Sequence, residues 1–269
     1  MKRLVAGLGV TLLASCSSTA KPSATPTTQH ESVDAPPKDV VAAAFKPVMV
    51  DQGEFGHYLG NRMIGAEVFK VERNGLGYRI TSRFESHQGR TELELFTDLN
   101  FGTMGGTLTA KMPAPPPSPS SNGGGGNGSS APPAELELTS ELSRDDKGNL
   151  VSAFNNGREI ETKTSLRPVD WFIGGPFAAI LLPLCGVTGT ETKSYLIFPD
   201  DTVDVFAATA LVLDGKRTVN IRRARFASSG KTFYVACEGG NIVGHRSGKM
   251  VSARRDDASV QAALTKLPD

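Results

Sequence analysis

Apolar and polar side chains alternate along much of the chain after residue 60. In residues 78–85, Tyr78, Ile80 and Phe84 occupy one side of an extended segment, and most of the intervening residues are polar. This two-residue period is typical of a β-strand with one buried face. Similar segments, many of them bounded by turn-forming Gly, Asn and Asp residues, are 66–73, 91–96, 135–142, 142–153, 218–226 and 231–245. The pattern predicts about nine to eleven strands, most of them paired with their sequence neighbours in an antiparallel sheet.

One segment departs from this alternation because nearly all of its residues are apolar. Residues 169–187 read VDWFIGGPFAAILLPLCGV and include the single tryptophan, Trp171. The segment is too short, and too interrupted by proline, to cross a membrane. Pro176 suits the first position of a helix, so we expect a short helix from about Phe177 to Leu184. Because a helix that is apolar on every side must be covered, the sequence predicts a mainly β fold, with a curved antiparallel sheet or half-barrel of hairpins wrapped around this helix.

The C-terminal segment predicts a second short helix. Residues 258–267 place apolar side chains at the i, i+3, i+4 and i+7 positions of a helix. These side chains are Val260, Ala263, Leu264 and Leu267. We expect this helix to cap the sheet.

A low-complexity segment interrupts the β-rich part of the chain. Of the 21 residues from 113 to 133, 19 are Pro, Gly, Ser or Asn, a composition typical of a flexible linker. The segment either joins two domains or forms a long loop between neighbouring strands of one domain. The flanking residues 91–96 and 135–142 alternate in the same way, which favours the loop, because closure entropy grows only slowly with loop length. We therefore expect a single domain over residues 39–269.

The N-terminus has the organisation of an export signal. Lys2 and Arg3 precede an apolar stretch that extends to Leu13, and the sequence then continues Ala14-Ser15-Cys16. A basic start, a short apolar region and small residues before a cleavage site are typical of a secretory signal peptide. An ordinary signal peptide ending in a chance cysteine is the alternative to a lipoprotein signal.

The four residues Leu13-Ala14-Ser15-Cys16 resemble the lipobox of bacterial lipoproteins. The resemblance implies removal of residues 1–15 and acylation of Cys16, giving a lipid anchor in the membrane of the bacterial cell envelope. Two or three acyl chains on one residue suffice for stable anchoring. Ser17 follows the cysteine, and this favours the outer membrane over retention in the inner membrane. The sequence leaves open which face of the membrane carries the protein.

Composition indicates a disordered segment after Cys16, and net charge indicates whether the protein binds nucleic acid. Residues 16–38 are rich in Ser, Thr, Pro and Ala, so we expect a disordered tether between the lipidated Cys16 and the folded domain. The whole chain has 29 Lys and Arg against 28 Asp and Glu, and removal of residues 1–15 also removes Lys2 and Arg3. Because nucleic-acid binding depends on an excess of basic residues, we expect no nucleic-acid partner.

The body of the chain resembles the LolA and LolB lipoprotein carriers and related uncharacterised envelope proteins. The resemblance rests on the strand-turn pattern of residues 60–85, the apolar segment from Trp171 to Leu184, and a closing hairpin that includes residues 231–235 and 241–243. It covers about 200 residues as a pattern and contains no diagnostic motif, and the glycine-rich insertion is foreign to it. It implies a curved sheet that encloses a hydrophobic helix and carries lipid.

Motifs for catalysis or metal binding are missing from the sequence. The histidines His30, His57, His87 and His245 are scattered and have no metal-ligand spacing. There is no nucleophile elbow, residues 229–232 lack the preceding glycine of a phosphate-binding loop, and residues 199–204 lack the oxygen spacing of a calcium loop. We therefore expect a protein that is not an enzyme and that has no cofactor or metal.

Cys185 and Cys237 are the two cysteines other than Cys16. In an exported protein these two cysteines either form a disulfide between the apolar segment and the last hairpin or remain two buried free thiols.

Five side chains are candidates for binding a ligand. In a strand over residues 218–226, Arg223 and Arg225 share a face with Val219 and Ile221, whereas Arg222 faces the other way. Such arginines suit an anionic head group, although charges that protect an edge strand explain them equally well. Trp171, Phe172 and Phe177 belong to the apolar segment. We expect a non-catalytic module that binds a lipid or acyl chain between sheet and helix; the alternative is a structural or envelope-protein-binding lipoprotein with a filled core.

Overall fold

The computed structural model describes residues 46–113, 135–155 and 159–268. These residues belong to one compact unit that spans residues 38–269. Residues 1–15, Cys16 and most of the expected tether and loop lie outside the described residues, so those predictions stay predictions. No helix in the described part of the chain has the length and apolar character needed to span a bilayer.

The described residues form one antiparallel sheet of fifteen strands, which confirms the predicted fold class. The strand order is β8-β7-β6-β5-β4-β3-β2-β1-β15-β14-β13-β12-β10-β9, and β11 also pairs with β12. The strands are β1 (Val48–Leu59), β2 (Arg62–Arg73), β3 (Gly77–Ser86), β4 (Gly89–Asp98), β5 (Thr103–Pro113), β6 (Glu135–Arg144), β7 (Leu150–Asn155), β8 (Ile160–Thr164), β9 (Lys193–Ile197), β10 (Asp201–Val205), β11 (Thr209–Leu213), β12 (Arg217–Phe226), β13 (Thr232–Glu238), β14 (Asn241–Ser247) and β15 (Met250–Arg254).

The structure contains more strands in its described residues than the expected nine to eleven. The additional strands include the short β8, β9, β10 and β11, each five residues long. Such short strands carry a weak alternation of their own and are defined by hydrogen bonds to a longer neighbour. Their existence therefore depends on pairing, which a periodicity count does not detect.

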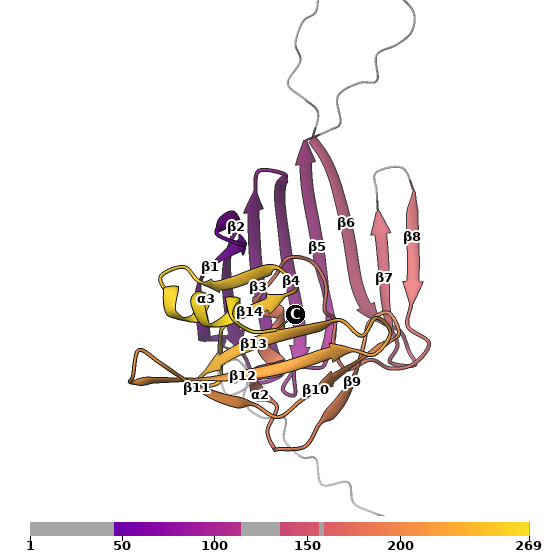
Figure 1. The fold of residues 1–269 in the computed structure, drawn as a ribbon. Helices are drawn as coiled ribbons and strands as arrows, with labels where there is room; N and C mark the ends of the chain where they lie inside the picture. The colour runs from indigo at the N-terminus through magenta and orange to yellow at the C-terminus, as the bar shows by residue number, and fades with distance from the viewer. Residues whose placement is uncertain (1–45, 114–134, 156–158, 269) are drawn as a thin grey trace, which may run out of the picture. The chain divides into compact units, whose positions relative to one another are not determined.

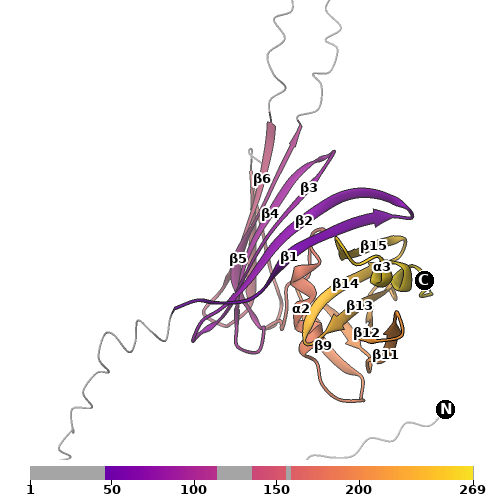
Figure 2. The ribbon, with the colours of Figure 1, turned by 90° about the vertical axis from the view of Figure 1, so that its left-hand side faces the viewer.

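The sheet is strongly curved, and its two halves face each other across the apolar segment. Figure 1 shows β2 to β6 as tall strands, with β12, β13 and β14 crossing in front of them. In Figure 2 the two halves form separate layers, and α2 (Leu182–Gly186) lies between them. Strand β1 pairs with β15 at the junction, from Phe55 opposite Arg254 to Leu59 opposite Met250. The sheet therefore wraps around the apolar segment as predicted.

The helical part of the apolar segment differs from the expected helix over residues 177–184. It consists of a 3-10 turn, η1 (Ala179–Leu181), followed by α2, and Pro183 lies in the first turn of α2. Proline has no N–H to donate and its ring disturbs the preceding turn, so Pro183 is tolerated only near a helix start. The α-helix consequently begins at Leu182, one residue before Pro183, instead of running from Phe177 to Leu184. Gly175 has a φ of 74° in the turn that precedes η1.

The concave side of the sheet and the apolar segment form the main hydrophobic core. Every residue from Phe177 to Leu182 is at most 5% exposed. The strand side chains that face the segment come from both halves of the sheet and include Phe55, Phe69, Val71, Ile80, Leu93, Leu95, Val203, Val205, Val235 and Ile242. Burial of so much apolar surface is the dominant stabilising contribution to this arrangement.

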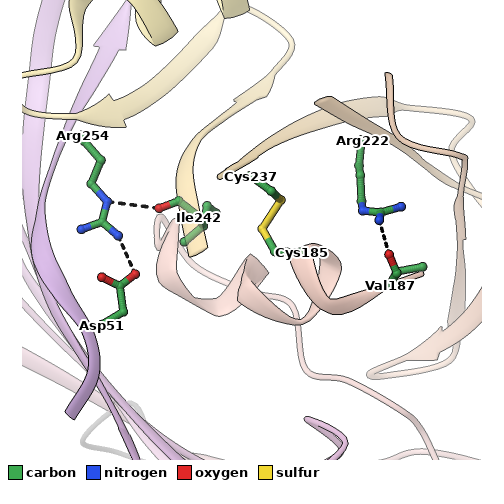
Figure 3. Close-up of a disulfide and its surroundings, with 7 residues drawn as sticks. All are labelled: Asp51, Cys185, Val187, Arg222, Cys237, Ile242 and Arg254. Atoms are coloured by element: carbon green, nitrogen blue, oxygen red, sulfur yellow. Dashed lines mark hydrogen bonds and ion pairs between the residues drawn. A yellow bond between two sulfur atoms is a disulfide. The ribbon is translucent and has the colours of Figure 1, made fainter. Parts of the chain in front are cut away.

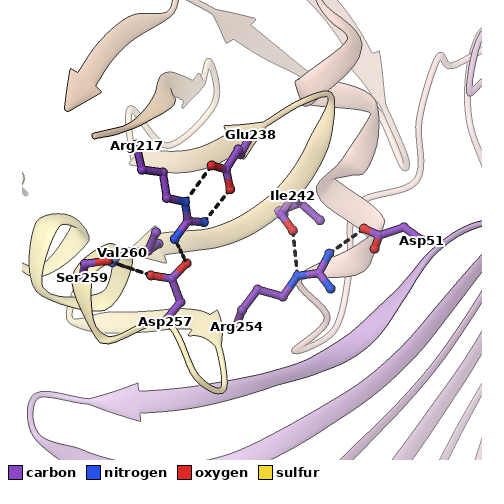
Figure 4. A network of polar contacts seen from close by, with 8 residues as sticks. All are labelled: Asp51, Arg217, Glu238, Ile242, Arg254, Asp257, Ser259 and Val260. Carbon is purple, nitrogen blue, oxygen red and sulfur yellow. Dashed lines mark hydrogen bonds and ion pairs between the residues drawn. The ribbon is translucent and has the colours of Figure 1, made fainter. Parts of the chain in front are cut away.

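A second core lies on the opposite face of strands β12 to β15. There α3 (Ala258–Thr265), shorter than the expected 258–267, buries Val260 and Leu264 against those strands. Asp257 caps the helix by accepting a hydrogen bond from the Val260 N–H at 3.0 Å. Arg217 joins this cap to the sheet through ion pairs of 2.6 Å to Asp257 and to Glu238 (Figure 4). Strands β12 to β15 are thus covered on both faces.

An arginine also closes the junction between the two halves of the sheet. Arg254 pairs with Asp51 at 2.5 Å and donates to the Ile242 carbonyl at 3.1 Å (Figure 4). Its guanidinium lies over the rings of Phe55 and Phe69, at 5.1 Å and 4.6 Å from their centroids. Cation–π contacts of this kind stabilise a partly buried arginine.

Strands β5 and β6 flank the low-complexity segment and are direct neighbours. Their register extends from Gly106 opposite Leu142 to Pro113 opposite Glu135. Both belong to the same sheet and to the same compact unit. This is the pairing of a hairpin with an expanded connection.

Cys185 and Cys237 are paired in a disulfide with a Cα–Cα distance of 5.5 Å (Figure 3). Cys185 is the fourth residue of α2, and Cys237 lies in β13. The bond therefore fastens the C-terminal end of the apolar segment to the centre of the second half of the sheet.

Removing this disulfide should lower stability without changing the fold. The bond joins residues 52 apart, and on the chain-entropy model the loss is about 4 kcal/mol. We expect the double variant Cys185→Ser, Cys237→Ser to unfold at a correspondingly lower urea concentration, and wild type in reductant to match it. Equal stability of the oxidised wild type and the double variant would contradict the prediction.

Candidate functional site

The five predicted ligand-binding residues divide between the two faces of the second half-sheet. Trp171, Phe172 and Phe177 lie on the concave side, within or against the main core. Phe177 is buried beneath the sheet, and Phe172 is half-buried. Trp171 stacks on Tyr195 with ring centroids 4.0 Å apart. These aromatic residues occupy one continuous apolar region, as the sequence predicted.

Arg223 and Arg225 lie on the opposite face of β12, away from the aromatic residues. Arg223 places its guanidinium 4.1 Å from the ring centroid of Phe206 and lines a cavity of about 500 Å³ beside Ile221 and Tyr234. Arg225 pairs with Asp204 at 3.3 Å. The sequence expectation about faces holds for this strand, but the structure does not bring these two arginines to the aromatic site.

Of the three predicted aromatic residues, Trp171 borders a second cavity of about 570 Å³, and Phe172 and Phe177 are not part of its wall. Its wall combines Trp171 and Tyr195 with residues 98–102, with the end of α2 and with Lys193. Two carboxylates also line it. Asp98 accepts hydrogen bonds of 2.8 Å from the N–H groups of Asn100 and Gly102, and Asp170 accepts one of 2.8 Å from the Leu196 N–H. The cavity wall thus combines aromatic and aliphatic surface with several charged and polar groups.

Burial and charge alter the acid–base behaviour of this wall. Burial, followed by the neighbouring Asp170 carboxylate, raises the pKa of Tyr195, and Arg222 opposes that rise. Tyr195 is therefore a neutral hydroxyl at physiological pH. The sequence predicted for Arg222 only that it faces the side of β12 opposite to Arg223. In the structure its Nη2 donates a hydrogen bond to the Val187 carbonyl (Figure 3). Its positive charge acts on Tyr195.

A buried polar network lies deeper in the main core and was missed by the sequence analysis. Ser252 Oγ lies 2.7 Å from His57 Nδ1, and His57 Nε2 lies 3.2 Å from Glu67 Oε2. Ser82 donates to Glu67 Oε1 at 2.7 Å. The sequence signal for Glu67 is its position on β2, because it shares a face with the buried Phe69 and Val71. A carboxylate on the apolar face of a strand indicates a specific buried partner.

Glu67 connects this network to the apolar segment. Its two carboxylate oxygens accept hydrogen bonds from the Ala178 N–H at 2.6 Å and the Ala179 N–H at 3.2 Å. These N–H groups lie at the start of η1, where a helical turn has no internal acceptors for them. A negative charge at that position is also favoured by the helix dipole. The carboxylate therefore fixes where η1 begins beneath the sheet.

Serine, histidine and a carboxylate are also the residue types of a nucleophilic relay. Here His57, Glu67 and Ser252 are all fully buried, and none lines the cavities described above. A nucleophile must be reached by its substrate, so this arrangement supports a role in positioning η1. Among the described residues, no cluster of three or more His, Cys, Asp or Glu side chains is arranged to hold a metal.

Replacing Glu67 should destabilise the protein strongly. In Glu67→Gln one carboxylate oxygen becomes an amide NH₂, which faces donors and leaves a buried N–H without an acceptor. We expect a loss of about 3 kcal/mol or more in urea unfolding, because breaking a buried charged network leaves its partners unsatisfied. The control Glu92→Gln, on a half-exposed carboxylate that pairs with Arg90, should leave stability nearly unchanged. Equal effects of the two substitutions would contradict this role for Glu67.

His245 should make stability depend on pH. It is buried beside His57, with ring centroids 6.3 Å apart, and its Nδ1 has no hydrogen-bond partner among the described residues. Burial, then His57, lower its pKa to about 4 from an ordinary value of 6.5, and Glu67 opposes the shift. Between these values the unfolded chain binds more protons than the folded one, so stability falls as pH decreases from 6.5 to 4.

The expected loss from this group is about 3 kcal/mol across that range. Urea unfolding at pH 7, 5.5 and 4 measures it. His245→Gln should remove that part of the slope, whereas His87→Gln, on an exposed loop residue, should retain the wild-type slope. An unchanged slope in His245→Gln would refute the assignment.

Comparisons of this chain with protein-family models, with curated proteins and with solved structures find no match. The resemblance to lipoprotein carriers therefore stays a prediction from the sequence pattern, and the site is interpreted from its own geometry.

Proposed function

We propose that the protein is a non-catalytic, lipid-anchored component of the bacterial cell envelope that binds an apolar or amphiphilic ligand, such as a lipid or acyl chain, between the sheet and residues 169–187. One observation carries the proposal. The apolar concave face of the sheet is covered by a segment that is irregular over most of its length and contains only short helical turns in the described residues.

The way this segment is attached supports exchange with a ligand. Its first part is fixed by backbone hydrogen bonds, including those of Asp170 and Trp171 to the Leu196 carbonyl. From Gly174 to Gly186, in the described chain, no backbone hydrogen bond joins the segment to a strand. This part contacts the sheet through side chains, the Glu67 carboxylate and one disulfide. Apolar contacts are non-directional, so an acyl chain satisfies the same concave surface.

A second function is favoured by a different observation. Residues 177–182 fill the space beneath the sheet, each at most 5% exposed. A core that is already close-packed without a ligand is what a structural or partner-binding lipoprotein requires. In that case the partner is another envelope protein, and the apolar segment is simply part of the core.

Native mass spectrometry separates the two functions. The full-length chain carrying Cys16→Ser, which has no thiol to acylate, is purified without detergent and sprayed before and after denaturation. Ligand binding predicts additional mass that matches lipid and disappears on denaturation, and saturable binding of a fluorescent fatty acid. A clean apo mass together with no fatty-acid binding would refute the proposal and favour the filled core.

A further inference from the structure

Arg222 is a buried cation whose hydrogen-bonding capacity is largely unused. Its side chain extends from β12 toward the concave side, and the residue is 9% exposed. Nη2 donates to the Val187 carbonyl, just beyond the end of α2 (Figure 3). Nε and Nη1 are buried and donate to no group of the described chain. A guanidinium carries five N–H donors and remains charged in proteins, so this state is energetically unfavourable.

Two other arginines of the structure, Arg217 and Arg254, have the carboxylate partners that Arg222 lacks. Arg217 binds the carboxylates of Glu238 and Asp257. Arg254 binds Asp51. Within the described residues, Arg222 forms an ion pair with no carboxylate, and burial lowers its pKa with only Tyr195 opposing that shift. Because Tyr195 is neutral, the positive charge of Arg222 is not balanced by a neighbouring anion.

The unbalanced charge lies beside the cavity of about 570 Å³. Arg222 lies behind the cavity wall and is not part of it. Val187, which accepts its hydrogen bond, and Tyr195, whose pKa it affects, both line the cavity. Trp171 and Pro183 provide apolar surface in the same wall. The carboxylates of Asp98 and Asp170 lie elsewhere in it and repel an anion from their own positions. An anionic group is therefore directed toward Arg222, and an apolar chain attached to it lies along the aromatic surface.

The geometry points to a subsite at Arg222 for the anionic head group, a carboxylate or phosphate, of an amphiphile whose chain packs on Trp171 and Tyr195. This inference rests on the proposed binding of an amphiphilic ligand and names the chemistry that selects it. The unused donors of Arg222 are buried behind the cavity wall, so the Tyr195 side chain must move aside before the anion accepts hydrogen bonds from them. Charge-assisted hydrogen bonds of this kind are among the strongest in proteins when they are shielded from water.

Fluorescence of Trp171 reports on this cavity directly, because it is the single tryptophan of the chain. The full-length Cys16→Ser protein is titrated with dodecanoate, with dodecanol of the same chain length, and with acetate. We expect dodecanoate to bind about tenfold or more tightly than dodecanol, and acetate to bind far more weakly than either. Equal affinities for dodecanoate and acetate would overturn the inference that the ligand is an amphiphile and would indicate a site for small anions.

Substitutions distinguish a ligand site from a structural contact. Arg222→Met should lower dodecanoate affinity at least tenfold and leave dodecanol affinity unchanged, and Arg222→Lys should retain part of the preference. Arg223→Met, on the opposite face of the same strand, is the control and should change neither affinity. Replacing an unpaired buried charge by an apolar side chain should leave the melting temperature unchanged or raise it. A lower melting temperature in Arg222→Met with unchanged dodecanoate affinity would assign Arg222 to holding Val187 and overturn the inference.

The same titrations separate failure of this inference from failure of the proposed function. Equal binding of dodecanoate and dodecanol, both unaffected by Arg222→Met, would overturn the head-group subsite while the apolar binding function stands. If neither ligand changes Trp171 fluorescence or binds by native mass spectrometry, both proposals fail.

Discussion

The apolar segment 169–187 has almost no polar side chains to turn toward water, Asp170 excepted, and this constraint organises the rest of the fold. Enclosing the segment requires apolar surface on several sides, which a flat sheet does not provide. The sheet therefore curves until side chains from both of its halves contact the segment. Few directional bonds hold the helical part of the segment against the sheet. The chief ones are the hydrogen bonds to the Glu67 carboxylate at the start of η1 and the disulfide from Cys185 to Cys237.

A consequence of this curvature is that the second half of the sheet is buried on both faces. One face of β12 to β15 covers the apolar segment, and α3 covers the other. Side chains one residue apart on β12 consequently meet different surroundings. Arg222 faces the apolar segment, whereas Arg223 lies over Phe206 on the other side. The two arginines differ in chemistry because of this alternation, although they are adjacent in the sequence.

The two buried polar features of the main core contrast in how far they are satisfied. The carboxylate of Glu67 accepts hydrogen bonds from Ser82, Ala178 and Ala179 and contacts His57, so it behaves as a completed structural network. Within the part of the chain that the structure describes, Arg222 has one carbonyl partner and two buried nitrogens without a hydrogen-bond partner. Completed networks stabilise a unique packing, whereas an uncompensated buried charge is typical of binding sites. This contrast is why the ligand is placed at Arg222 and not at Glu67.

The alternation of apolar and polar residues, as from Tyr78 to Glu85, was sufficient to predict a mainly β fold. The apolar run from Phe177 to Leu184 was sufficient to predict which segment the sheet encloses. Both predictions follow from local periodicity and burial. The helix boundary required the structure, since the apolar run alone does not show that Pro183 lies in the first turn of a separate helix that follows η1. Strands such as β8 depend on their neighbours in the same way. The partners of Glu67 lie from 10 to 112 positions away in the sequence, and Val187, the described partner of Arg222, lies 35 positions away. Only tertiary packing therefore determined which of their polar atoms have partners.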